Sequence, residues 1–345
     1  MAFRTGTAAN HTALWAELLD FLQNDTALVA AGQAWTREWE ISGQPEVVMK
    51  SPSGALVGLK RIDNALTAGE SVIWMSGCTG VIPTGASFVD HVNSLTRTPA
   101  VFLDQAPMQY WMVANGRRFV VVIKISTVYQ AMYGGFFLPY ASPAAYPYPL
   151  FIGGTRGFSG YSAAQIATSW RASEADHYRH FTYAKTSNGA TTGFDSQAAM
   201  LSPEASWHAG TIDYNVGSYV LPRFTMGPRA FPDYIGSTNI GENLTPNFSS
   251  TSSSNNPQRY GYADIRSRLI AGLNGEMSLT PITLMRFNNT TSPDPVTYGI
   301  LDGCFSVPGV GNTAESLITI GSVNHLVVPN VQRTAATEYW ALALE

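Results

Sequence analysis

The dipeptide Asn115-Gly116 constrains the fold of this chain more than any other feature, because it separates two apolar runs at the spacing of a β-hairpin. Asn and Gly tolerate the positive φ values that both central positions of a type I′ turn require. A two-residue turn fixes the register of the two strands. The predicted cross-strand pairs are Ala114 with Arg117, Met112 with Phe119, Trp111 with Val120, and Tyr110 with Val121. The second strand runs through Phe119 to Ile123 without polar alternation, so we expect it inside a sandwich or under a partner chain.

A segment rich in proline and aromatic residues follows the hairpin, from Tyr133 to Pro149. Its prolines disfavour a helix and an interior strand, so we expect an extended segment that lays aromatic rings on a surface. The favoured interpretation is that these rings close the core of their own domain. The sharper alternative is a subunit interface, because Tyr and Phe are enriched in interface cores. The candidate interface residues are Tyr133, Phe136, Phe137, Tyr140, Tyr146 and Tyr148.

The composition of the 345 residues favours a β protein with few charges. Only 13% of the residues are charged, about half the usual share, while 12% are aromatic. We therefore expect much of the surface to be covered by neighbouring subunits or to consist of uncharged polar loops. The formal charge of −4 provides no net positive charge to attract a phosphate backbone, which argues against a nucleic-acid partner.

One amphipathic helix and many short strands are predicted along the chain. Asn10 can cap a helix that runs to Gln23, whose apolar positions recur every three or four residues and need a sheet to pack on. The apolar positions of this helix are Leu14, Trp15, Leu18, Leu19 and Leu22. Short alternating runs separated by Gly and Pro then follow, which is typical of a β-sandwich. The predicted fold class is mainly β, with a minor α+β component: sandwich-like sheets, one N-terminal helix and long loops.

Three regions are expected. Residues 1–152 form the helix and the sandwich core, residues 153–295 form a loop-rich elaboration with short strands, and residues 296–345 return to the core. In the last region, Gly321-Ser322 predicts a second hairpin that pairs Ile320 with Val323, and Glu338 to Glu345 predicts a terminal strand.

The two cysteines and the apolar runs indicate the cellular compartment in which the chain is made. Cys78 and Cys304 are far apart and match no metal-ligand spacing, so two reduced and packed thiols are expected, with a disulfide as the alternative. No apolar stretch approaches the length of a bilayer span, and the first residues lack a long apolar secretion segment. The chain is therefore expected to be made in the cytosol and to have no membrane partner.

Catalytic and metal-binding motifs are weak in this sequence. His177 and His180, with Glu174 and Asp176 beside them, have metal-ligand residue types but no third ligand at a known spacing. A hydrogen-bonded surface patch is the favoured interpretation of this cluster. Gly157-Phe-Ser-Gly160 falls one residue short of a nucleophile elbow. Carboxylates for sugar hydrolysis are available but have no defined spacing: Asp213, Asp233, Glu242, Asp294 and Asp302. We expect no enzyme activity, no cofactor and no metal.

Aromatic residues in the loops between 207 and 262 suggest a second class of function. These rings could stack on a glycan of the host surface, as a peripheral receptor-binding module would require. The favoured interpretation is that they pin long loops to the body of the protein. The candidate contacts are Trp207, His208, Tyr214, Tyr260 and Tyr262.

Several blocks of the chain resemble one family. Leu28 to Trp35 after the first helix, Tyr110 to Gly154, and the closing block from Ile300 through Leu344 are similar to virion structural proteins of tailed bacteriophages. The resemblance covers the two ends and the middle of the chain, and it is weak between Thr155 and Ile300. It implies a virion component of the neck, tail or baseplate, assembled in the host cytoplasm with copies of itself and with other virion proteins. It brings no catalytic residues with it.

Overall fold

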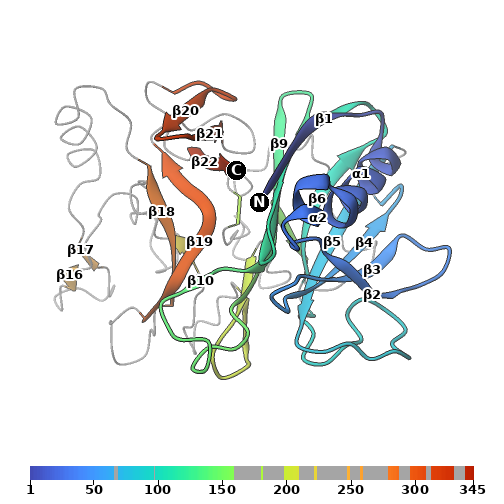
Figure 1. The fold of residues 1–345 in the computed structure, drawn as a ribbon, viewed down its shortest axis with the longest axis horizontal. Coiled ribbons are helices and arrows are strands. Elements are labelled where there is room, and N and C mark those ends of the chain that lie inside the picture. The colour runs from blue at the N-terminus through green and yellow to red at the C-terminus, as the bar shows by residue number, and fades with distance from the viewer. Residues whose placement is uncertain are drawn as a thin grey trace.

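The structure is a computed structural model, and it confirms a mainly β fold built from three large antiparallel sheets and an N-terminal helix (Figure 1). The residues that it describes are 1–65, 69–96, 98–158, 180–181, 198–209, 221–223, 247–248, 257–258, 279–286, 296–307, 312–329 and 339–345. Among these residues, no helix is long and apolar enough to cross a bilayer.

The central sheet contains the predicted hairpin. Its strand order is β1-β7-β8-β9-β11-β13-β14. The bounds are β1 Ala2–Ala8, β7 Met108–Ala114, β8 Arg118–Ile125, β9 Val128–Phe136, β11 Leu150–Gly153, β13 Ala198–Leu201 and β14 Trp207–Ala209. The two edges of this sheet are therefore formed by β1 and β14.

The N-terminal sheet has the order β12-β6-β5-β4-β3-β2. Its bounds are β12 Arg156–Phe158, β6 Thr98–Asp104, β5 Glu70–Cys78, β4 Leu56–Ile62, β3 Glu46–Lys50 and β2 Thr36–Glu40. These strands follow the short alternating runs of the sequence. They form an antiparallel meander from β2 to β6, with short connections from β2 to β5 and a longer loop, residues 79–97, between β5 and β6.

The C-terminal sheet has the order β15-β18-β19-β22-β21-β20, and β10 pairs with β19 beside it. The bounds are β15 Leu221–Arg223, β18 Thr280–Arg286, β19 Val296–Val307, β22 Tyr339–Leu344, β21 Val323–Val328, β20 Leu317–Ile320 and β10 Leu138–Pro139. A separate pair joins β16 Asn247–Phe248 to β17 Pro257–Gln258. The predicted terminal strand is thus β22, which lies inside the sheet between β19 and β21.

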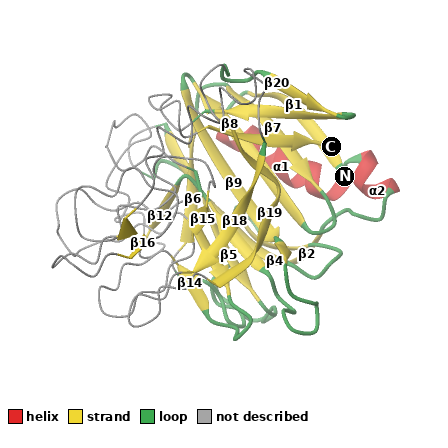
Figure 2. Ribbon diagram, turned by 90° about the vertical axis from the view of Figure 1, so that its left-hand side faces the viewer, coloured by secondary structure: helices red, strands yellow, loops and turns green. Residues whose placement is uncertain are grey.

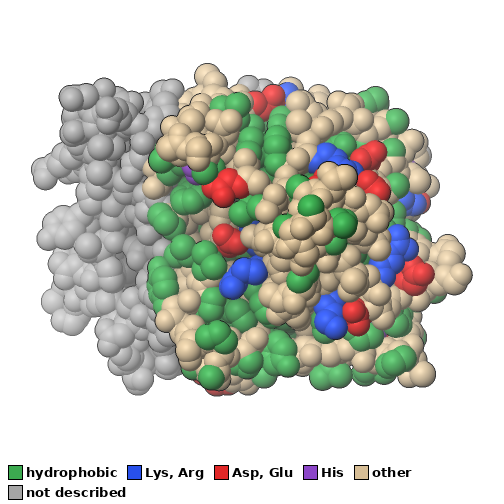
Figure 3. Space-filling model, viewed as in Figure 1, with side chains coloured by type: hydrophobic (Ala, Val, Ile, Leu, Met, Phe, Trp, Pro, Cys, Tyr) green, Lys and Arg blue, Asp and Glu red, His purple; other side chains and the backbone are tan. Residues whose placement is uncertain are grey.

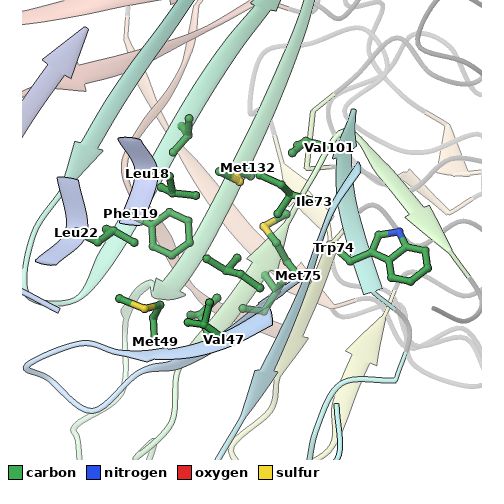
Figure 4. Packing of buried hydrophobic residues seen from close by; sticks show 14 of the residues in the cluster. Leu18, Leu22, Val47, Met49, Ile73, Trp74, Met75, Val101, Phe119 and Met132 are labelled. Carbon is green, nitrogen blue, oxygen red and sulfur yellow. The ribbon is translucent and has the colours of Figure 1, made fainter. Parts of the chain in front are cut away.

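The central sheet is buried on both faces, which explains the apolar run in β8. One face packs on the helix α1 (His11–Asn24) and on the N-terminal sheet, and Figure 4 shows Leu18 and Leu22 of α1 beside Phe119. The other face packs on the C-terminal sheet, where Val120 and Trp340 belong to one core cluster. Alternate residues of β8 therefore enter two different cores, so a half-polar pattern would leave polar groups buried.

The helix α1 begins where it was predicted. The Asn10 side chain accepts a hydrogen bond of 2.9 Å from the Ala13 backbone N–H, which satisfies one of the free donors of the first turn. The five predicted apolar positions are all buried. Two neighbouring elements were not predicted: the short helix α2 (Thr26–Ala30) and the first strand, β1. The alternation in β1 is hidden because the buried ends of the strand are the small residues Ala2 and Ala8, while the large apolar Phe3 is exposed.

The register of the first hairpin corrects the sequence prediction by two residues. Ala114 pairs with Phe119 rather than with Arg117, so the central positions of the turn are Gly116 and Arg117. The φ of Gly116 is not positive, and the Asn115 side chain accepts bonds from the backbone N–H groups of Arg117 and Arg118. Asn115 therefore occupies the first position of the turn, where its side chain mimics a backbone acceptor. A shift of two residues keeps every side chain on its predicted face.

The second hairpin matches its prediction. Ile320 pairs with Val323 and Leu317 pairs with Leu326 across the two residues Gly321 and Ser322. Gly321 has a φ of 62°, which is the positive value that the first central position of such a turn needs.

The prediction that Tyr133 to Pro149 is not an interior strand is wrong for the first part of this segment. Tyr133 to Phe136 belong to β9, an interior strand paired with both β8 and β11. The prolines begin only at Pro139, which lies in the edge strand β10, so they do not interrupt the sheet. The C-terminal region returns to the core as expected, while most of residues 153–295 lie outside the described residues.

Candidate functional site

Four of the six candidate interface rings belong to the core of this chain. Tyr133 and Phe137 have no exposed surface, Tyr146 is 2% exposed and Phe136 is 6% exposed. Their atoms are unavailable to a partner, so the subunit-interface prediction is wrong for these four residues. The ring centroids of Tyr133 and Phe151 lie 5.4 Å apart in an edge-on contact. This contact agrees with the favoured interpretation, in which the rings close the core of their own domain.

Tyr146 anchors the segment after β10. Its ring packs edge-on against Phe137 at 5.5 Å, and its hydroxyl donates to the backbone carbonyl of Leu201. Burial raises the pKa of this hydroxyl well above its usual range, with the nearby Tyr298 as a further cause. A neutral, hydrogen-bonded phenol in this position holds the segment against the body of the protein.

The remaining two candidate rings are exposed on the same segment. Tyr140 is 65% exposed and Tyr148 is 40% exposed, on either side of the buried Tyr146. The backbone N–H of Tyr140 donates to the Tyr298 carbonyl at 2.9 Å, so β19 holds this part of the chain in place. These two rings remain candidates for contact with a partner.

Trp207 pins a loop to the body of the protein, which is the favoured interpretation of this ring. Its indole N–H donates to the Asn93 carbonyl at 2.7 Å. Its ring packs against the core between the central and N-terminal sheets. A Cβ atom on Gly77 would lie 2.7 Å from the ring, so the indole touches the backbone there. His208 lies in β14, while Tyr214, Tyr260 and Tyr262 lie outside the described residues.

The predicted metal cluster is represented in the described residues by His180 alone. This side chain is buried rather than on the surface, so the expected surface patch is wrong at this position. Its Nδ1 lies 3.1 Å from the Thr155 hydroxyl, and its Nε2 lies 3.3 Å from the Pro329 carbonyl. Burial lowers the pKa of His180 to about 3, although the Pro329 carbonyl opposes the shift.

Glu174, Asp176 and His177 lie outside the described residues, as do Ser159 and Gly160 of the incomplete nucleophile motif. Gly157 lies in the strand β12. In the part of the chain that the structure describes, no group of three or more His, Cys, Asp or Glu side chains could hold a metal ion. The absence of a metal requirement therefore stays a prediction.

Both cysteines are free and buried, as the sequence predicted. Burial raises the pKa of the Cys78 thiol to about 12, and the pKa of the Cys304 thiol also to about 12. Neither is a reactive thiolate at neutral pH.

A buried ion pair that joins two sheets was not predicted. Arg118 at the start of β8 has no exposed surface, and its Nε lies 3.3 Å from Asp302 Oδ2 in β19. The Asn115 amide donates to the same oxygen at 3.0 Å. The only sequence signal was the position of Arg118 directly after a turn, which normally indicates an exposed side chain. Because Arg118 lies in β8 and Asp302 lies in β19, this pair ties the central sheet to the C-terminal sheet.

Exposed apolar side chains gather where the edges of two sheets meet. The edge strands β1 and β20 lie at the same end of the molecule (Figure 2). Leu317 is 56% exposed, Ile320 is 48% exposed and Phe3 is 38% exposed. A groove of about 420 Å³ runs between the strands, and its lining residues include Phe3, Thr5, Trp111, Leu317, Leu326 and Leu344.

Charge is sparse over the body of the protein. Figure 3 shows patches of hydrophobic side chains among uncharged atoms on the described part of one face, with the Lys and Arg side chains mostly beside Asp or Glu. Arg4, for example, reaches Asp20 at 2.8 Å and Asp25 at 3.2 Å. The chain matches no protein-family model and no curated protein sequence.

Proposed function

We propose that this chain is a non-enzymatic structural component of a tailed-phage virion. It joins or decorates the tail, at the baseplate, the tail or the neck, as part of a symmetric oligomer. Its partners are copies of itself and other virion proteins, and its place is the virion.

The observation that carries this proposal is the apolar, uncharged edge formed by β20. Leu317 and Ile320 are large, apolar and exposed, and the strand Leu317–Ile320 contains no charge and no proline. Soluble monomers usually protect such an edge with one or the other, because an open apolar strand pairs with another chain. An oligomer removes that hazard by covering the edge.

Two further features support the structural role. The charged share of 13% is low for a chain that stays apart from its own copies in solution. The blocks that resemble virion proteins include most of β7 to β11 in the central sheet and most of β19 to β22 in the C-terminal sheet. These strands enclose the core between the two sheets.

The described residues do not favour the alternative of a receptor- or glycan-binding module in the loops 207–262. Trp207 is the one candidate ring of that set whose side chain the structure describes, and its indole N–H and its ring are already engaged. A sugar-stacking ring needs a free face.

The test is the composition of purified particles of the phage that encodes this chain. Quantitative mass spectrometry should find the chain in a fixed ratio to the tail proteins, and a density map should place its copies around the tail axis. Absence of the chain from particles that are infectious would overturn the proposal. Its presence only at the tips of fibres would favour the receptor-binding alternative.

A further inference from the structure

The free edge of β20 exposes a complete set of backbone hydrogen-bonding groups. Ile320 and Val323 flank a two-residue turn, so this pair exchanges both of its hydrogen bonds within the hairpin. Hydrogen-bonded pairs alternate along an antiparallel ladder, which directs the N–H and C=O groups of Ile318 inward as well. The bond of 2.8 Å from the Val327 N–H to the Ser316 carbonyl continues this alternation. The N–H and C=O groups of Leu317 and Thr319 therefore point out of the sheet, and no described strand pairs with them.

The side chains of β20 divide between two surfaces. Leu317 faces the groove between the sheets, because its partner Leu326 belongs to the core between the central and C-terminal sheets. Ile318 faces the opposite side, where it packs beside Val327 and Ala341. Each side of the strand thus carries an apolar side chain, and none of its four residues carries a charge.

The groove is an open end of the sandwich at this edge. Phe3 and Thr5 of β1 line the groove and are exposed, although they lie on the face of the central sheet that the C-terminal sheet covers elsewhere. The C-terminal sheet ends at β20, so β1 and β20 border this opening. One more strand added to β20 would pair with the outward backbone groups of Leu317 and Thr319.

We infer that the added strand is β20 of a second copy of this chain, paired antiparallel about a two-fold axis. This inference deepens the proposed function, because it names the surface through which the oligomer forms. A two-fold axis normal to the sheet keeps the groove side of one copy continuous with the groove side of the other. Residues that oppose each other must then be an even number apart in register.

One register uses all of the free backbone groups. If Leu317 opposes Thr319 of the second copy, each copy contributes the outward N–H and C=O of both residues, and Ile318 opposes its own counterpart on the axis. Pairing like with like requires an uncharged strand, since a charge at the axis would meet itself.

The experiment measures the mass of the full chain in solution by sedimentation across a range of concentrations. The wild-type chain has a mass of 37.2 kDa and should form dimers or multiples of them. Ile318→Lys and Ile318→Glu should each weaken the pairing at least tenfold, because like charges would face each other across the axis. An equimolar mixture of the two variants should restore the dimer.

Ile320→Lys is the matched control. Ile320 lies on the same strand and the same face, but the two copies of this residue would be about 14 Å apart, beyond the screening length of about 8 Å at physiological salt. This variant should pair almost as well as the wild-type chain. Equal weakening by Ile320→Lys and Ile318→Lys would overturn the register.

Thr319→Pro tests the backbone bonds even if the charged variants fold poorly. The Thr319 N–H points out of the sheet, so proline removes a contact with the second copy and no bond within the hairpin. This variant should keep its thermal midpoint and become monomeric.

The outcomes separate the inference from the proposed function. A wild-type chain that associates with unchanged strength in Ile318→Lys and Thr319→Pro would sink the β20 interface and leave the oligomer in place. A wild-type chain that is monomeric at every concentration would also overturn this inference, while the particle analysis decides the virion role separately.

Discussion

At the scale of single residues, burial decides which side chains carry chemistry and which carry structure. Four buried side chains have polar or reactive groups: His180, Cys78, Cys304 and Tyr146. In each case desolvation shifts the pKa in the direction that keeps the group neutral, downward for the histidine and upward for the thiols and the phenol. A neutral group in an apolar environment serves packing and hydrogen bonding.

Trp15 gives the first prediction. Its ring is 8% exposed on the buried side of α1, so Trp15→Ala should destabilise the fold by about 3–5 kcal/mol through lost burial and a residual cavity. Urea unfolding followed by circular dichroism would measure this change. The control is Val29→Ala on the exposed side of α2, which should change the free energy of unfolding by less than about 0.5 kcal/mol. An unchanged midpoint for Trp15→Ala would mean that α1 does not support the sheet.

His180 gives a prediction about acid. Its pKa is lowered from 6.5 to about 3 in the folded chain, so the unfolded chain binds one more proton between these values. Stability should therefore be complete above pH 6.5 and fall as the pH decreases towards 3, by at most about 1.4 kcal/mol per pH unit from this group.

The comparison variant is His180→Gln, whose side-chain amide can form hydrogen bonds but cannot titrate. Unfolding midpoints measured from neutral pH down to the range where carboxylates begin to titrate should fall less steeply in the variant than in the wild-type chain. Parallel curves would show that His180 is not buried in its neutral form.

At the scale of elements, the segment between β10 and β11 combines a core anchor with exposed rings. Tyr146 is fixed by Phe137 and by the Leu201 carbonyl, while Tyr140 and Tyr148 are exposed. The expected extended backbone is wrong here, because the segment folds into a turn in which the Tyr146 N–H donates to the Ser142 carbonyl at 2.9 Å. This turn and the prolines hold the two exposed rings in place, so little entropy is lost when the rings meet a partner.

Substitutions should separate these two roles. Tyr146→Ala should cost about 3–5 kcal/mol of stability, which is usual for a buried ring. Replacing Tyr140 and Tyr148 together by Ser should leave the unfolding midpoint within about 0.5 kcal/mol of the wild-type value but reduce incorporation into particles. Particle composition after complementation measures that second effect. Normal assembly with loss of adsorption to cells would instead favour the receptor-binding alternative.

At the scale of the whole molecule, the central sheet lies between the N-terminal and C-terminal sheets, and a buried ion pair ties it to the C-terminal sheet. Asp302→Asn removes the charge that faces the fully buried guanidinium of Arg118, and the isolated charge should cost about 3–5 kcal/mol. Arg118→Met should also destabilise the chain, because it leaves the carboxylate with the Asn115 amide alone.

The double variant should recover much of this loss, since neither charge remains buried without its partner. Denaturant unfolding of the four chains of this cycle would measure the coupling between the two sheets. Simple addition of the two single losses would mean that Arg118 and Asp302 do not interact.

The sequence by itself determined the elements whose signals are local. The Asn10 cap, the apolar stripe of α1, the Gly321 turn and the buried strand around Phe119 each follow from backbone preferences or from hydrophobic spacing over a few residues. The position of the C-terminal strand in the core also followed from its composition, because a terminal apolar run needs a sheet to cover it.

Only the tertiary structure decided the features that depend on partners distant in the chain. The first turn moved by one residue, and the pairing register by two, because the side chain of Asn115 could close the turn, and both registers keep the same faces. The rings from Tyr133 to Tyr148 are alike in sequence, yet some are buried and others are not. Phe136 enters the core with the N-terminal sheet, Tyr133, Phe137 and Tyr146 enter the core with the C-terminal sheet, and Tyr140 and Tyr148 stay exposed. β1 and the ion pair of Arg118 with Asp302 became visible only when strands far apart in the chain lay together, since pairing and desolvation are properties of the assembled layers.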